Sequence, residues 1–143
     1  MEPTVYWYAL CAVVLFFKMF ALSSYQGFYR LTRRTFVNPE DAGVFKKSAA
    51  EEELPQVRRA AKAWLNDLEN IPIFLGLGTA YIFVDASSEV ATIIFPLFTI
   101  ARILHTLTYL LGLQPWRTIV FVVGMFCLFI MSWNIGLVLL GFA

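Results

Sequence analysis

The sequence predicts an all-α membrane protein, a four-transmembrane-helix bundle formed by a single domain over residues 1–143. Hydrophobic residues make up 59% of the 143 residues, and the mean hydropathy is +0.70. A soluble domain of this length could not bury so much apolar surface. The apolar residues also fall into four runs of about 20 residues, the length that crosses the hydrocarbon core of a bilayer.

Turn and charge signals separate the four predicted spans. The sequence NPED at 38–41 ends the first helix, whose amphipathic end reaches about residue 34, because the residue before a proline is pushed out of helical conformation. The second helix is expected to begin near Pro55, and Gly76 and Gly78 within it favour close packing against a neighbouring helix. The expected spans are approximately 5–24, 64–84, 90–111 and 117–141, with a cytosolic loop at approximately 35–58.

The loop charges predict how the chain is oriented. Residues 30–62 contain eight Lys or Arg against five Asp or Glu, whereas the second loop offers only Asp85 and Glu89. Positive charge is retained on the cytosolic side of a membrane. The first and third loops are therefore expected to face the cytosol, with both termini on the other side.

Composition argues against several other classes of function. The net charge of +1 is not pooled into a basic tail, so no nucleic-acid partner is expected. Cys11 and Cys127 lie in apolar runs and are interpreted as small core residues. The acidic run at 51–53 is interpreted as a solvated patch, and no metal site is expected.

Ionisable residues inside the predicted spans form two stripes at helical spacing. The first stripe contains Arg59, Lys62, Asn66 and Glu69 on the second helix, with Asp67 and Asn70 beside it; the second contains Arg102, His105 and Tyr109 on the third helix. A charge at the centre of a bilayer costs about 2.5–3.5 kcal/mol on insertion scales, so these groups must face the protein interior or a water-filled cavity. Lys18, alone in the first span, is expected to snorkel or to pair with an inward acid.

Two interpretations of this polar set are open. The charged groups either pair with one another and hold the helices together, or they bind a ligand. Pairing requires balanced charge, yet the cations outnumber Asp67 and Glu69; the cations are Arg30, Lys62, Arg102, Arg117 and Arg59. The excess favours an anionic ligand with carboxylates, with Glu69 left to receive an ammonium group.

Four segments resemble the MAPEG family, and within it the branch of type 1 microsomal glutathione transferases and prostaglandin E synthases. They are FYRLTRR at 28–34, NPED at 38–41, LNDLEN at 65–70 and ARILHTLTYL at 101–110. The resemblance implies a homotrimer that binds glutathione between neighbouring subunits near the cytosolic side. It also implies hydrophobic electrophile substrates drawn from the membrane, with glutathione as co-substrate and no metal.

The resemblance also implies roles for individual residues. Arg117 matches the arginine beside the glutathione sulfur, where it would stabilise the thiolate. The residues implied to bind glutathione are Arg30, Lys62, Asn66, Glu69, His105, Tyr109, Thr118 and Phe121. Lys62 stands in place of an arginine and loses its bidentate fork. Whether Asp67 and Arg102 contact ligand or only hold helices together is left open.

Departures from the family pattern bear on the activity. Trp64 replaces a histidine found in both the transferases and the prostaglandin synthases. Leu65 replaces an arginine and Phe121 a tyrosine of the prostaglandin synthases, and Ala42 replaces a cysteine of the mammalian transferases. These differences favour general conjugation or peroxide reduction over prostaglandin synthesis.

The sequence thus predicts a membrane-bound glutathione transferase that also reduces lipid hydroperoxides and serves detoxification. The alternatives are a non-catalytic lipid-binding or scaffold member of the family, a prostaglandin E synthase-like isomerase, or a small proton-coupled transporter. The expected location is the endoplasmic reticulum or mitochondrial outer membrane of a eukaryote, or the cytoplasmic membrane of a bacterium.

Overall fold

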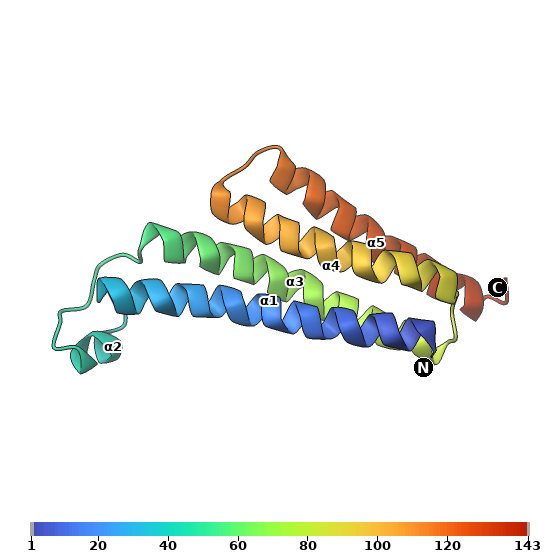
Figure 1. Ribbon diagram of the computed structural model, residues 1–143, viewed down its shortest axis with the longest axis horizontal. Helices are drawn as coiled ribbons and strands as arrows, with labels where there is room; N and C mark the ends of the chain where they lie inside the picture. The colour runs from blue at the N-terminus through green and yellow to red at the C-terminus, as the bar shows by residue number, and fades with distance from the viewer. Residues whose placement is uncertain (1, 143) are drawn as a thin grey trace.

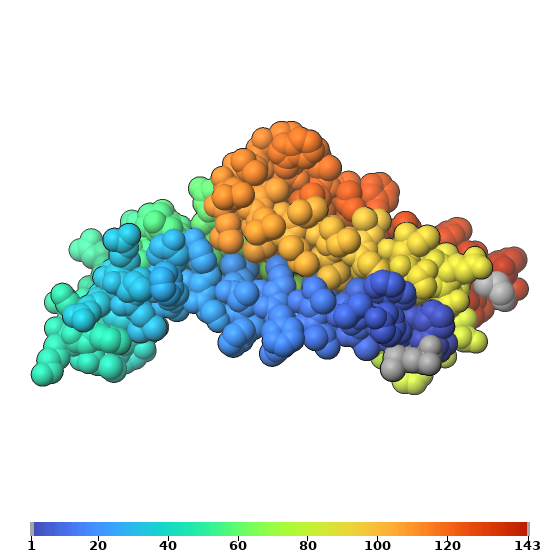
Figure 2. Space-filling model, viewed as in Figure 1, coloured from blue at the N-terminus to red at the C-terminus, as the bar shows by residue number. Residues whose placement is uncertain are grey.

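The computed structural model describes residues 2–142 and is helical, with no strand in that range, which confirms the predicted all-α class. Four long helices lie side by side in an elongated body (Figure 1), and the junction of the last two projects from it (Figure 2). The helices are α1 Pro3–Arg33, α2 Pro39–Val44, α3 Pro55–Phe83, α4 Ser88–Leu111 and α5 Trp116–Leu139.

Local sequence accounts for where the long helices begin and end. The Glu2 carboxylate caps α1 by accepting from the backbone N–H of Thr4 at 3.0 Å, and Ser87 Oγ caps α4 in the same way. Gly112 ends α4 in the left-handed region, with φ of 72°. A Cβ at that position would also lie 2.6 Å from Arg59 Nη1, the mobile end of a long side chain, so backbone conformation is the main reason for glycine there.

The segment between α1 and α3 is more ordered than a solvated loop. Helix α1 ends at Arg33, before the NPED sequence, and Pro39 opens the short helix α2 instead of only breaking a helix, because proline is tolerated in a first helical turn. Phe36 and Ala42 are buried within this segment. Phe36 stacks on Phe45, with ring centroids 4.8 Å apart, so the segment packs on itself at the end of the molecule where α1 ends (Figure 1).

Helices α1, α4 and α5 are long and apolar enough to cross a membrane. Helix α3 is of similar length, but charged side chains occupy its N-terminal half, so its assignment as a span stays a prediction. Large apolar side chains point outward from the apolar helices, including Phe16 and Phe17 on α1 and Phe126 and Phe129 on α5. Such a surface suits contact with lipid.

Helices α3 and α4 each pack against all three of the other long helices. Phe74 of α3 stacks on Phe98 of α4, with ring centroids 4.5 Å apart, and both side chains are fully buried. Gly78 of α3 lies against the ring of Tyr8 from α1, where a Cβ would collide with ring carbons, whereas Gly76 faces open space. The predicted close approach of helices therefore depends on Gly78 and not on Gly76.

Replacing Gly78 with alanine should lower the stability of the protein by about 1–3 kcal/mol, because the added methyl group forces Tyr8 out of its position. Gly76→Ala is the matched control and should leave stability unchanged or slightly raised. Thermal unfolding in detergent measures both variants. Equal melting temperatures for the two would contradict this account of the α1–α3 contact.

Candidate functional site

A basic cavity of about 660 Å³ opens at the end of the bundle where α3 and α5 begin and α4 ends. Basic and tyrosyl side chains dominate its lining, so it favours an anionic ligand. The lining residues are Tyr25, Pro55, Gln56, Arg58, Arg59, Lys62, Tyr109, Leu110, Gly112 and Arg117.

The cations of this cavity are largely unpaired. Arg58 has a carboxylate partner, Glu52, at 3.4 Å. Within residues 2–142, Arg59, Lys62 and Arg117 form no ion pair with any carboxylate. The cation excess expected from the sequence thus gathers in one place, although two of the cations counted toward it, Arg30 and Arg102, are paired elsewhere.

Arg117, in the first turn of α5, is held over an aromatic face. Its guanidinium carbon lies 4.7 Å from the centroid of the Tyr109 ring, a cation–π geometry. With the Gln114 amide oriented so that its oxygen faces Arg117, that oxygen accepts hydrogen bonds from Nη2 at 2.6 Å and from Nε at 3.2 Å. Arg117 is therefore fixed from two sides while its charge remains available to a ligand.

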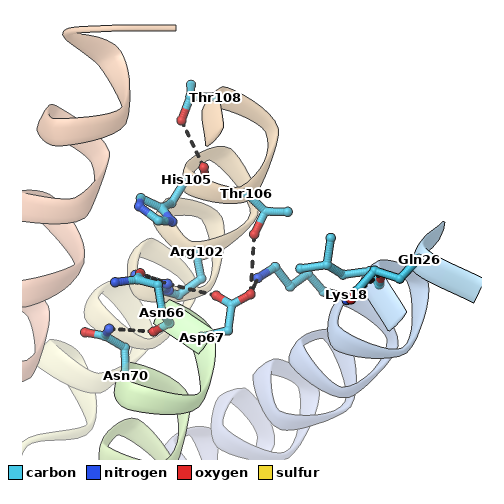
Figure 3. Close-up of polar contacts among 10 residues, drawn as sticks. Lys18, Gln26, Asn66, Asp67, Asn70, Arg102, His105, Thr106 and Thr108 are labelled. Atoms are coloured by element: carbon cyan, nitrogen blue, oxygen red, sulfur yellow. Dashed lines mark hydrogen bonds and ion pairs between the residues drawn. The ribbon is translucent and has the colours of Figure 1, made fainter. Parts of the chain in front are cut away.

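A second polar cluster lies in the interior, between α1, α3 and α4 (Figure 3). The Asp67 carboxylate accepts from Arg102 Nη2 at 2.8 Å and also pairs with Lys18 of α1. Arg102 and Asp67 are 1% and 0% exposed, and Thr106 Oγ1 lies 3.4 Å from the same carboxylate. Of the two outcomes expected for Lys18, pairing with an inward acid is the one observed.

His105 is buried one turn beyond Arg102 on α4. Its ring centroid lies 5.8 Å from that of Tyr109 and 6.0 Å from that of Phe121. Its Nδ1 is enclosed and has no hydrogen-bond partner among residues 2–142. His105 thus packs beside Tyr109 and Phe121 and lies one helical turn from Arg102 of the ion cluster.

The remaining predicted ligand residues lie apart from the basic cavity. Arg30 donates through Nε at 2.9 Å and Nη2 at 2.5 Å to Glu53, so this glutamate is not part of a freely solvated patch as predicted. Glu69 is exposed and has no ion-pair partner in the described chain. Thr118 is exposed and hydrogen-bonds to the Gln114 side chain at 3.1 Å.

The eleven predicted site residues therefore form three groups within one chain. Lys62, Tyr109 and Arg117 line the cavity; Asn66, Asp67, Arg102, His105 and Phe121 lie in or beside the interior cluster; Arg30, Glu69 and Thr118 lie outside both.

Sequence reasoning did not identify Gln114 or Tyr25 as part of the site. Gln114 lies in a turn beside Pro115, and nothing in the sequence there indicates that its side chain contacts Arg117. Tyr25 sits among the aromatic residues common at membrane interfaces. Lys18 did carry a signal, because a lone lysine in an apolar span requires a partner.

Replacing Asp67 with asparagine should destabilise the protein by about 3–5 kcal/mol, because Lys18 and Arg102 would then be two buried cations without a counter-charge. Lys18→Met should cost much less, since it leaves Asp67 and Arg102 as a balanced pair. Thermal unfolding of both variants in detergent tests this order. A lysine variant as unstable as the aspartate variant would show that charge balance does not control the cluster.

Comparison with known proteins identifies the family. Residues 8–137 match the model of the MAPEG family. Human microsomal glutathione S-transferase 1 is 42% identical over 122 residues, which cover 82% of this chain and 79% of the relative. Mouse prostaglandin E synthase is 35% identical over 131 residues, covering 90% and 84%. The resemblance seen in the sequence is confirmed, and with its three apolar helices this integral membrane protein belongs to the MAPEG family.

Proposed function

We propose that this protein is a membrane-bound glutathione transferase that uses glutathione as co-substrate to modify lipophilic electrophiles. The observation that carries the proposal is the cavity in which Arg59, Lys62 and Arg117 have no carboxylate partner among residues 2–142. Relatives of this chain at 40–42% identity are named microsomal glutathione S-transferase 1, which supports the same activity.

The charges of glutathione match those of the site. The tripeptide carries two carboxylates, one ammonium group and one thiol. Lys62 and Arg30 are proposed to bind the carboxylates, Glu69 the ammonium group and Arg117 the sulfur, with hydrogen bonds and packing from the other predicted residues. Those residues are Asn66, His105, Tyr109, Thr118 and Phe121.

Arg117 would supply the chemical activation. A thiol of this kind has a pKa of about 8.5, and a fixed guanidinium beside the sulfur lowers that pKa by stabilising the thiolate. The proton leaves to solvent, the thiolate forms a bond to the electrophilic carbon, and the bond from that carbon to its leaving group breaks. Contacts with Tyr109 and Gln114 keep the guanidinium in place, so little reorganisation is needed during the reaction.

The complete site is proposed to form between subunits of a homotrimer. In a single chain, Arg30 and Glu69 lie away from the cavity that holds Lys62 and Arg117, so one subunit does not surround glutathione with all the expected groups. A neighbouring subunit would bring these groups together. We further propose four membrane spans in one domain, with this site facing the cytosol, and an additional lipid hydroperoxide reductase activity.

A prostaglandin E synthase-like isomerase is the second candidate function. The observation that favours it is the 34–35% identity to proteins named prostaglandin E synthase. A non-catalytic lipid-binding role has less support, because the unpaired cations of the cavity have no use in binding a neutral lipid.

Purified protein assayed with glutathione and an aryl halide, a lipid hydroperoxide or a prostaglandin endoperoxide tests the proposal. We expect turnover of the aryl halide and the hydroperoxide, together with saturable glutathione binding by calorimetry. Turnover of the endoperoxide alone would support the isomerase instead. Absence of both binding and turnover would reject the enzyme proposal.

Replacing Arg117 with leucine should lower kcat/KM for conjugation of chlorodinitrobenzene by about 100-fold or more, because the charge that stabilises the thiolate is lost. Arg33→Leu, at an exposed position near the end of α1, is the matched control and should retain activity. Conjugation rates measured across pH distinguish the cause: in the Arg117 variant the rate should rise at higher pH than in the wild-type protein. An unchanged pH profile would mean that Arg117 does not act on the thiol.

A further inference from the structure

The side-chain amide of Asn66 has one fixed orientation. Its oxygen, Oδ1, accepts a hydrogen bond of 2.6 Å from Arg102 Nη2, and the same nitrogen donates to Asp67 Oδ1 at 2.8 Å (Figure 3). A guanidinium group has only donors. The Asn66 oxygen must therefore face Arg102, and its NH₂ group must face the other way.

The outward NH₂ group is available to a ligand. Asn66 is half-buried, and its Nδ2 forms no hydrogen bond within residues 2–142 and is not enclosed. On α3 it lies one turn from Lys62, which lines the basic cavity, and one turn from Glu69 on the same stripe. A donor at this position favours an acceptor atom on the ligand.

Arg102 is itself fixed by charge and burial. It is 1% exposed, and its partner Asp67 also pairs with Lys18. The cluster of Lys18, Asp67 and Arg102 holds two cations and one carboxylate. Arg102 therefore has no reason to leave Asp67, and it stays in place as the donor to the Asn66 oxygen.

We propose that Arg102 is a positioning residue, which orients the Asn66 amide so that the site accepts a carboxylate or carbonyl oxygen of the ligand at this point and rejects a donor. Arg102 does so without touching the ligand. This inference rests on the proposed function, because the ligand whose acceptor meets Asn66 is glutathione.

The first test is Asn66→Asp. The aspartate keeps the shape of the side chain and still accepts from Arg102, but it presents a carboxylate oxygen outward where the NH₂ group had been. Because the cluster holds one more cation than anion, the added carboxylate balances its charge and the fold should persist. The dissociation constant for glutathione, measured by calorimetry, should rise at least tenfold.

The matched control is Asn38→Asp, which makes the same chemical change at an exposed position in the segment between α1 and α3. The Asn38 side chain does not cap α2 but donates to the Asp41 carboxylate at 3.1 Å on the surface, so the variant loses one exposed hydrogen bond away from the site and should bind glutathione as the wild type does. It controls for the added negative charge.

The second test is a double-mutant cycle that separates positioning from a purely structural role. Arg102→Met leaves Lys18 and Asp67 as a balanced pair and frees the Asn66 amide to turn. It should weaken glutathione binding severalfold in the wild-type background but have no further effect when Asn66 is already alanine. If Arg102→Met weakens binding by the same factor in both backgrounds, Arg102 does not act through Asn66 and the inference is wrong.

The outcomes also separate this inference from the proposed function. If the wild-type protein binds glutathione and Asn66→Asp binds it equally well, the inference fails and the transferase proposal stands. If the wild-type protein does not bind glutathione, both fail. If Arg102→Met does not fold, Asn66→Asp still overturns the inference when it binds glutathione as tightly as the wild type.

Discussion

The carboxylate of Asp67 is the contact on which the arrangement of three helices depends. It lies on α3 and pairs with Lys18 from α1 and Arg102 from α4, and all three side chains are largely buried. Charges in a low-dielectric interior interact strongly, and each loses its solvation in water. The register of α1, α3 and α4 is therefore tied to this cluster, and with it the position of every side chain that α3 and α4 contribute to the basic cavity.

Six of the cations, those counted toward the cation excess together with Lys18, divide into two kinds by their partners. Lys18, Arg30 and Arg102 have carboxylates within reach in the same chain, whereas Arg59, Lys62 and Arg117 have none among residues 2–142. The second kind shares one cavity with Tyr109. Paired charges hold elements together, and unpaired charges in a concave surface attract an anion. For these six cations, the presence or absence of a carboxylate partner separates structural roles from ligand-binding roles better than residue type does.

The helices and the residue types of the site could be predicted from the sequence. The ion-pair partner of each charged residue could not. Periodicity and length predicted the long helices within a few residues, because each has an apolar face and a clear end signal such as Pro55 or Gly112. Which cation meets which acid depends on contacts between helices distant in the chain, as for Lys18 with Asp67. The pairing of Arg30 with Glu53 was missed for the same reason, since Glu53 lies in an acidic run that looks solvated from sequence alone.

The stripe on α3 links the two polar regions. Asp67 faces the interior, Lys62 and Glu69 are exposed, and Asn66 lies between them with its oxygen turned inward to Arg102. Helix α3 thus carries residues that hold the helices together on one face and proposed ligand-binding residues on the adjoining face. Asn66 lies at the boundary between the two faces. Because Glu69 and Lys62 project from the subunit on the same side of α3, a ligand that bridged them would lie outside the packed core. A second subunit could cover such a ligand, which is the physical argument for the proposal that the complete site lies between subunits.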